Sequence, residues 1–151
     1  MRLLRLSLFL GGLFNLSMGF IFLSSDLLQN FFLWAESLEK RLFDIDVALM
    51  FPSDPLHRLL IHGFGAGAVI LGATLLYAVR NPRPLLPFIL LDGLGRLLFA
   101  SVMFYYVLTF SLIRTIFLFG VLEFAFALVY IWGSWQLKIE SGKRSGKEWK
   151  E

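Results

Sequence analysis

Residues 85–110 read LLPFILLDGLGRLLFASVMFYYVLTF, an apolar stretch interrupted by one aspartate and one arginine. A helix of about 20 apolar residues crosses the ~30 Å hydrocarbon core of a bilayer. A charge near the middle of such a helix is costly unless it finds a partner. The stretch therefore predicts a transmembrane helix whose Asp92 and Arg96 face other protein groups.

Three further stretches have the same length and character. Of the 151 residues in the chain, 58% are hydrophobic and 17% are aromatic, more than a soluble domain needs to fill its core. The predicted spans cover residues 3–23, 59–79, 85–110 and 113–135. We therefore predict an all-α, polytopic membrane protein, with a four-transmembrane-helix bundle in residues 1–137 and a loose basic tail in residues 138–151.

The long connection between the first two spans also carries a helical pattern. Apolar residues recur there at steps of three and four, with polar residues between them: Leu27, Leu28, Phe31, Phe32, Trp34, Leu38, Leu42 and Ile45. This pattern predicts an amphipathic interfacial helix over residues 26–45. Two roles stay open for it, a helix lying on lipid and a lid or docking surface over the bundle.

The basic residues indicate an orientation in the membrane. Arg2 and Arg5 begin the first span, Arg80 and Arg83 lie in the second connection, and the tail is rich in lysine. The first connection is instead mainly acidic. Because cytoplasmic loops carry an excess of Lys and Arg, both termini are expected in the cytoplasm, with the tail drawn to anionic lipid head groups.

Arg96 needs partners at its own depth. At ~1.5 Å per residue it lies roughly 17 Å from the cytoplasmic end of its helix, with Asp92 one turn away on the same face. Glu123 and Asn15 reach about the same depth in the fourth and first spans. We expect these four residues to converge. They would form either a network that fixes helix register, or a site that binds a polar ligand head or passes protons.

Small residues are expected to bring the helices close together, because lipid supplies no hydrophobic force between helices. The candidate packing glycines are Gly63, Gly67, Gly72, Gly93 and Gly95. His62 fits an interhelical hydrogen bond, or a contact to a pigment or quinone. Tyr130, near the inner end of the last span, is expected to anchor the chain at the membrane interface, as aromatic residues commonly do.

Several classes of chemistry are excluded or disfavoured. The chain has no Cys and two His, so it has no disulfide or thiolate metal site, and we predict no metal site. No nucleophile with a base and no cofactor motif is present, so no catalytic residue is proposed and an enzymatic role is disfavoured. The net charge of +3 comes from residues at span ends, which argues against a nucleic-acid partner.

Two adjoining segments carry a resemblance. The segments GAGAVILGATLLYAVRNPRP (65–84) and LLDGLGRLLF (90–99) resemble, over about 45 residues, small four-helix bacterial inner-membrane proteins of the DoxX-like and BphX-like kind. The resemblance implies a four-helix bundle in the bacterial inner membrane, often near oxidoreductase or degradation functions. It also implies that Gly95 and Arg96 are positions of interest.

Three functions follow as hypotheses. The first is an accessory or structural subunit of a membrane complex, whose partners are lipid and other membrane protein subunits or further copies of the chain. The second is a binder of a lipophilic small molecule, such as a quinone, lipid or pigment, with Arg96, Asp92, Glu123 and Asn15 at the polar end of the pocket. The third is a component of a transporter.

Overall fold

A computed structural model describes residues 2–46, 54–110 and 113–148, with side chains described as far as Ile139. These residues form five helices and no strand: α1 (Arg2–Leu23), α2 (Ser25–Phe43), α3 (Pro55–Arg80), α4 (Leu86–Phe110) and α5 (Thr115–Glu148). Four of them, α1, α3, α4 and the Thr115–Ile139 part of α5, are long and apolar enough to cross a membrane. The predictions of an all-helical chain and of four possible spans are therefore confirmed.

The helix ends differ from the predicted ones for local reasons. α3 begins at Pro55, four residues before the expected start, because Asp54 caps it by accepting hydrogen bonds from the backbone N–H groups of Leu56 and His57. Those bonds hold the pKa of Asp54 below its usual value. The helix of α5 continues as far as Glu148, into the segment that was expected to be a loose tail.

α1 and α3 pack closely and antiparallel through two pairs of glycines. A Cβ added to Gly72 would lie 2.8 Å from the carbonyl oxygen of Gly12, and one added to Gly65 would lie 2.9 Å from that of Gly19. In each helix the two glycines are seven residues apart, or two turns, so they lie on one face. The absence of side chains there lets the two backbones touch.

Three of the five predicted packing glycines make no close contact with another helix among the described residues. A Cβ added to Gly63, Gly67 or Gly95 would meet no atom of the described residues within 4 Å. Gly72 packs as expected. Gly93 packs against α5, where a Cβ added to Gly93 would lie 3.0 Å from the Cβ of Tyr130. The spacing of four within α3 was therefore the wrong guide, and the spacing of seven identifies the contact face.

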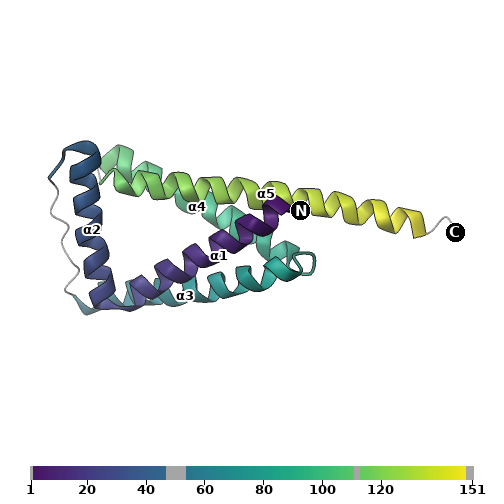
Figure 1. Cartoon of the computed structure of the whole chain (residues 1–151), viewed down its shortest axis with the longest axis horizontal. Helices are drawn as coiled ribbons and strands as arrows, with labels where there is room; N and C mark the ends of the chain where they lie inside the picture. Colours follow the sequence, from purple (N-terminus) through teal and green to yellow (C-terminus); the bar gives the residue numbers. More distant parts are fainter. Residues whose placement is uncertain (1, 47–53, 111–112, 149–151) are drawn as a thin grey trace.

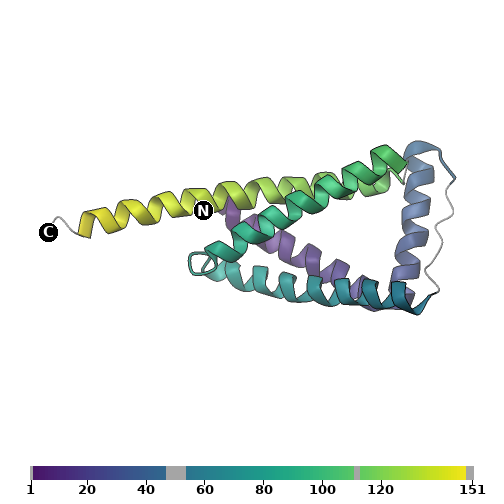
Figure 2. The same ribbon diagram turned by 180° about the vertical axis from the view of Figure 1, so that it is seen from behind.

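The helices form a wedge, which is narrow at one end and open at the other (Figure 1). At the narrow end all four long helices contribute to a buried core: Leu4, Leu8, Leu75, Ala78, Ile89, Tyr130 and Leu137. From there the α1–α3 pair and the α4–α5 pair separate. Seen from behind, α3 and α4 diverge from the turn that joins them (Figure 2).

α2 lies across the wide end and joins the two helix pairs (Figure 1). A single residue, Ser24, separates it from α1 and caps it by accepting a hydrogen bond from the N–H of Leu27. At its other end Asp44, in the left-handed conformation, ends the helix. α2 therefore bridges the two helix pairs at the wide end of the wedge. It does not qualify as a spanning helix.

Glu39 fixes the far end of α2 to the start of α5. Its carboxylate accepts hydrogen bonds from the backbone N–H groups of Arg114 and Thr115, at 2.8 and 2.9 Å, and from the Thr115 hydroxyl at 2.8 Å. The side chain is 1% exposed. Burial raises the pKa of Glu39, but these hydrogen bonds outweigh it and hold the pKa below its usual value of 4.5.

Candidate functional site

Arg96 joins α4 to α5 through two carboxylates. Its Nε donates to Asp92 Oδ2 at 2.8 Å, one turn earlier in α4, and its Nη1 donates to Glu123 Oε2 of α5 at 2.5 Å. All three side chains are less than a tenth exposed. The structure thus brings together three of the four residues expected to converge, and we call them the Arg96 network.

Aromatic rings hold the guanidinium from the side of α5. The Arg96 Cζ lies 5.3 Å from the ring centre of Phe126 and 5.4 Å from that of Tyr130, within the range of cation–π attraction. The third nitrogen, Nη2, is buried without a hydrogen-bond partner among the described residues. It lies toward Gly11 of α1, 3.7 Å from where a Cβ of that residue would stand.

Tyr130 is part of this arrangement, and the expectation that it is an interface anchor is wrong. It is fully buried, and its hydroxyl donates to the carbonyl oxygen of Ser7 in α1 at 3.1 Å. A Cβ on Gly11 would stand 2.1 Å from that hydroxyl oxygen, so the glycine leaves room for the tyrosine. Tyr130 therefore connects the α4–α5 pair to α1 beside the Arg96 network.

Two adjoining cavities lie between the helices of the wedge, next to this network. The outer one has a volume of about 330 Å³ and lies against α2, and the inner one, of about 420 Å³, lies mainly between α3 and α4. Both are lined by the same five residues where they meet: Asn15, Phe64, Ala68, Phe99 and Glu123. We call the two together the wedge cavity.

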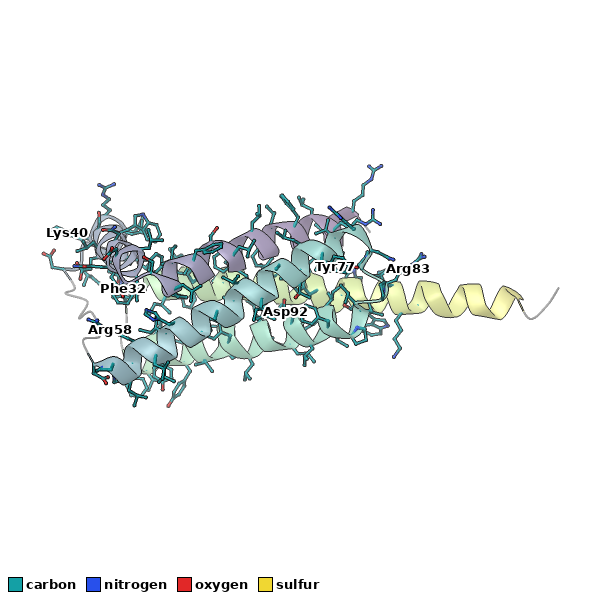
Figure 3. The ribbon with its side chains drawn as sticks, turned by 90° about the horizontal axis from the view of Figure 1, so that it is seen from below. Phe32, Lys40, Arg58, Tyr77, Arg83 and Asp92 are labelled. Carbon is teal, nitrogen blue, oxygen red and sulfur yellow. The ribbon has the colours of Figure 1, made fainter. Side chains whose placement is uncertain are left out.

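The walls of the wedge cavity are apolar and rich in aromatic rings. The outer part is lined by phenylalanines from all five helices: Phe14, Phe22, Phe31, Phe32, Phe64, Phe99 and Phe119. Phe31 and Phe32 belong to α2, so α2 forms one wall of the cavity (Figure 3 labels Phe32). The polar groups gather at the inner part, where Asp92, Arg96, Glu123 and Asn15 line the wall.

Asn15 reaches the cavity but not the network. Its side chain is 9% exposed and lines both parts of the cavity. No hydrogen bond joins its amide to another group within the described part of the chain. Asn15 therefore offers an unused donor and acceptor to the cavity.

The remaining sequence candidates lie elsewhere or have another role. His62 is half-buried near the start of α3 and is not among the described residues that line the cavity. Gly67 of α3 and Gly95 of α4 both line its inner part, where an added side chain would meet open space. These two glycines shape the cavity instead of packing the helices.

Glu39 is the residue that the sequence analysis overlooked. It is one of the polar residues that stand between the apolar ones in this helix, yet it shares the buried face with Leu28 and Ala35, at positions i, i+7 and i+11. An acid at helical spacing from buried apolar residues was the available signal.

The charged side chains of the site are paired with one another. Among the described residues no group of three His, Cys, Asp or Glu could hold a metal ion. The carboxylates are engaged with a guanidinium and not aligned with a nucleophile. Comparisons with protein-family models, with curated proteins and with solved structures find no match for this chain.

Proposed function

We propose that this protein binds a lipophilic small molecule within the membrane, in the wedge cavity. The observation that carries the proposal is a pair of adjoining, aromatic-lined cavities that share five lining residues, the inner one of which reaches the Arg96 network. Ligand sites are typically clefts of about 300–1,000 Å³, mostly apolar, with a few placed polar groups. The wedge cavity has this size and this division of polarity.

The open side of the wedge supports access from lipid. Residues from α3 and α4 contribute most of the inner lining, and these two helices diverge from their common turn (Figure 2). A molecule dissolved in the bilayer would enter between them with its apolar part toward the phenylalanines. Its polar part would then meet Asn15 and Glu123.

We also propose an orientation for the chain. Four arginines lie at the narrow end: Arg2, Arg5, Arg80 and Arg83. α2, which carries Asp26, Glu36 and Glu39, lies at the wide end (Figure 3 labels Arg83 and Lys40 at the two ends). The positive-inside rule then favours a cytoplasmic narrow end. α2, which is amphipathic, would rest in the opposite interface and roof the cavity.

The role of an accessory subunit and the likeness to DoxX-like proteins stay predictions from the sequence. Exposed apolar side chains on the long helices, such as Leu91, Leu98 and Leu108, suit lipid and a partner helix equally well. They therefore do not favour a complex over a lone chain. The wedge cavity, in contrast, favours a ligand.

Native mass spectrometry tests the binding proposal, using protein extracted from its own membrane in a mild detergent. We expect one defined lipophilic molecule to accompany the wild-type chain. Ala68→Phe, which fills the cavity where its two parts meet, should lose that molecule. Ala66→Phe, at an exposed position two residues earlier, should keep it. Equal amounts of the molecule on all three proteins would refute the proposal.

A further inference from the structure

The side chains that line the wedge cavity carry more negative than positive charges, a property separate from the size and polarity of the cavity. The Arg96 network contains one guanidinium and two carboxylates, which leaves one formal negative charge in excess when both acids are ionised. No other Lys or Arg and no His is found among the described residues that line the cavity. In a medium of low polarity such an unbalanced charge is costly, and either a proton on one carboxylate or a bound cation offsets it.

Glu123 lines both parts of the cavity, whereas Arg96 lines only the inner part and has its donor nitrogens bonded to carboxylates or buried. Arg96 donates hydrogen bonds from two of its nitrogens to the carboxylates, lies within cation–π range of Phe126 and Tyr130, and has its third nitrogen, Nη2, buried. A ligand in the cavity therefore cannot reach Nη2 without moving protein atoms. Glu123 lines both parts of the cavity, and only its Oε2 is bonded to Arg96.

Asn15 supplies a second polar group at the same place. It is more than nine-tenths buried, lines both parts of the cavity and has no hydrogen bond among the described residues. Its amide can donate as well as accept, and next to Glu123 its oxygen can accept a hydrogen bond from, or lie against, a positively charged head group. An anion would instead meet the carboxylates.

The aromatic walls favour the same sign of charge. The faces of phenylalanine rings attract cations, and this attraction strengthens where water is excluded. Phe64 and Phe99 line both parts of the cavity beside Glu123, and Phe14, Phe22 and Phe119 continue the wall toward α2. A large organic cation would thus find aromatic faces around its apolar groups and a carboxylate near its charge.

We propose that the wedge cavity selects lipophilic organic cations, such as alkylated or arylated ammonium and phosphonium ions, and holds their charge beside Glu123 and Asn15. This inference rests on the proposed function, because it names the chemical class of the ligand for the same cavity. It adds a preference by charge that an apolar cavity alone would not have.

Two ions of the same shape and opposite charge test the proposal. Radiolabelled tetraphenylphosphonium and tetraphenylborate are equilibrated with the full chain in lipid nanodiscs, and binding to the cavity-filled Ala68→Phe variant is subtracted as background. We expect saturable binding of the phosphonium ion that is about tenfold or more tighter than that of the borate ion. Saturable binding of both ions with equal affinity, or a preference for borate, would overturn the proposal.

Substitutions at the charged end give the second part of the test. Glu123→Gln should remove the preference for the cation, and Asn15→Asp, which adds a carboxylate of the same shape, should strengthen phosphonium binding. Asp26→Asn, at an exposed position of α2, is the matched control and should change neither. If Glu123→Gln does not fold, the wild-type comparison and Asn15→Asp still decide, and unchanged phosphonium binding in Asn15→Asp would count against the proposal.

The two proposals fail in different ways. If neither ion binds but a neutral lipophile accompanies the wild-type chain and is lost in Ala68→Phe, the cation preference is refuted and the binding function stands. If no lipophilic molecule of any charge binds in an Ala68-dependent manner, both are refuted.

Discussion

At the scale of single residues, Arg96 decides how the polar end of the wedge is built. Its two carboxylate partners lie on two helices, so removing the guanidinium leaves two buried acids facing each other. Breaking a buried pair from one side typically costs about 3–5 kcal/mol, whereas replacing all of its members with neutral groups is often close to neutral.

The network should therefore respond differently to single and combined changes. Arg96→Leu should lower the thermal stability in detergent by an amount equivalent to about 3–5 kcal/mol, followed by circular dichroism. Combining it with Asp92→Asn and Glu123→Gln should recover most of that loss, because no unpaired charge remains. A triple variant as unstable as Arg96→Leu would show that the loss comes from packing against Phe126 and Tyr130 and not from charge.

Sequence reasoning reached these residues unevenly. Asp92 and Arg96 were predictable as a pair because they are one helical turn apart, and Glu123 because helical rise gives depth. Tyr130 was misjudged because its place near a span end is typical of interface anchors, while its burial depends on Gly11 in a distant helix. That kind of pairing is set by tertiary packing and leaves no local signal.

At the scale of the elements, α2 depends on Glu39 for its position. The carboxylate accepts three hydrogen bonds at the start of α5, where backbone N–H groups lack partners within the helix and the helix dipole favours a negative charge. Because the folded-state pKa of Glu39 is lowered, its contribution is complete above its usual value of 4.5 and is lost as the pH falls through the lower, folded value.

Acid should consequently release α2 from α5. Spin labels on Ser37→Cys and Leu118→Cys, both at exposed positions, should report a longer and broader distance at about pH 3 than at about pH 7. Glu39→Gln should show that longer distance already at about pH 7, since it loses hydrogen bonds to a charged acceptor worth roughly 1.5–3 kcal/mol each. Asp26→Asn, at an exposed position of the same helix, is the control. A distance independent of pH in the wild-type chain would mean that Glu39 does not hold α2.

The elements themselves were largely predictable, and their contacts were not. The length of the apolar stretches predicted the four long helices, and the recurrence of apolar residues every three to four positions predicted α2. The glycine contacts between α1 and α3 were missed because several spacings of small residues coexist in α3. Only the matching seven-residue spacing in α1, Gly12 and Gly19 against Gly65 and Gly72, identifies the face that packs.

At the scale of the whole molecule, the wedge shape could not be predicted from the sequence. It depends on how far the two helix pairs separate, and that angle follows from the core at the narrow end and from the length of α2 at the wide end. Each long helix contributes at least one residue that lines both parts of the cavity: Asn15 from α1, Phe64 and Ala68 from α3, Phe99 from α4 and Glu123 from α5. None of these residues, taken alone, indicates a cavity in the sequence.

The orientation of the wedge is open to a direct test, because a chain without cysteine can carry one introduced thiol at a time. Ser37→Cys on α2 and Asn81→Cys at the end of α3 are exposed and lie at opposite ends of the wedge. With the basic narrow end in the cytoplasm, a membrane-impermeant maleimide should label Ser37→Cys from outside intact cells, and Asn81→Cys only in inverted vesicles. The reverse pattern would invert the orientation and place α2 in the cytoplasmic interface. Labelling of both thiols from one side would contradict four spans, and the wedge cavity could then not open between α3 and α4 into the bilayer.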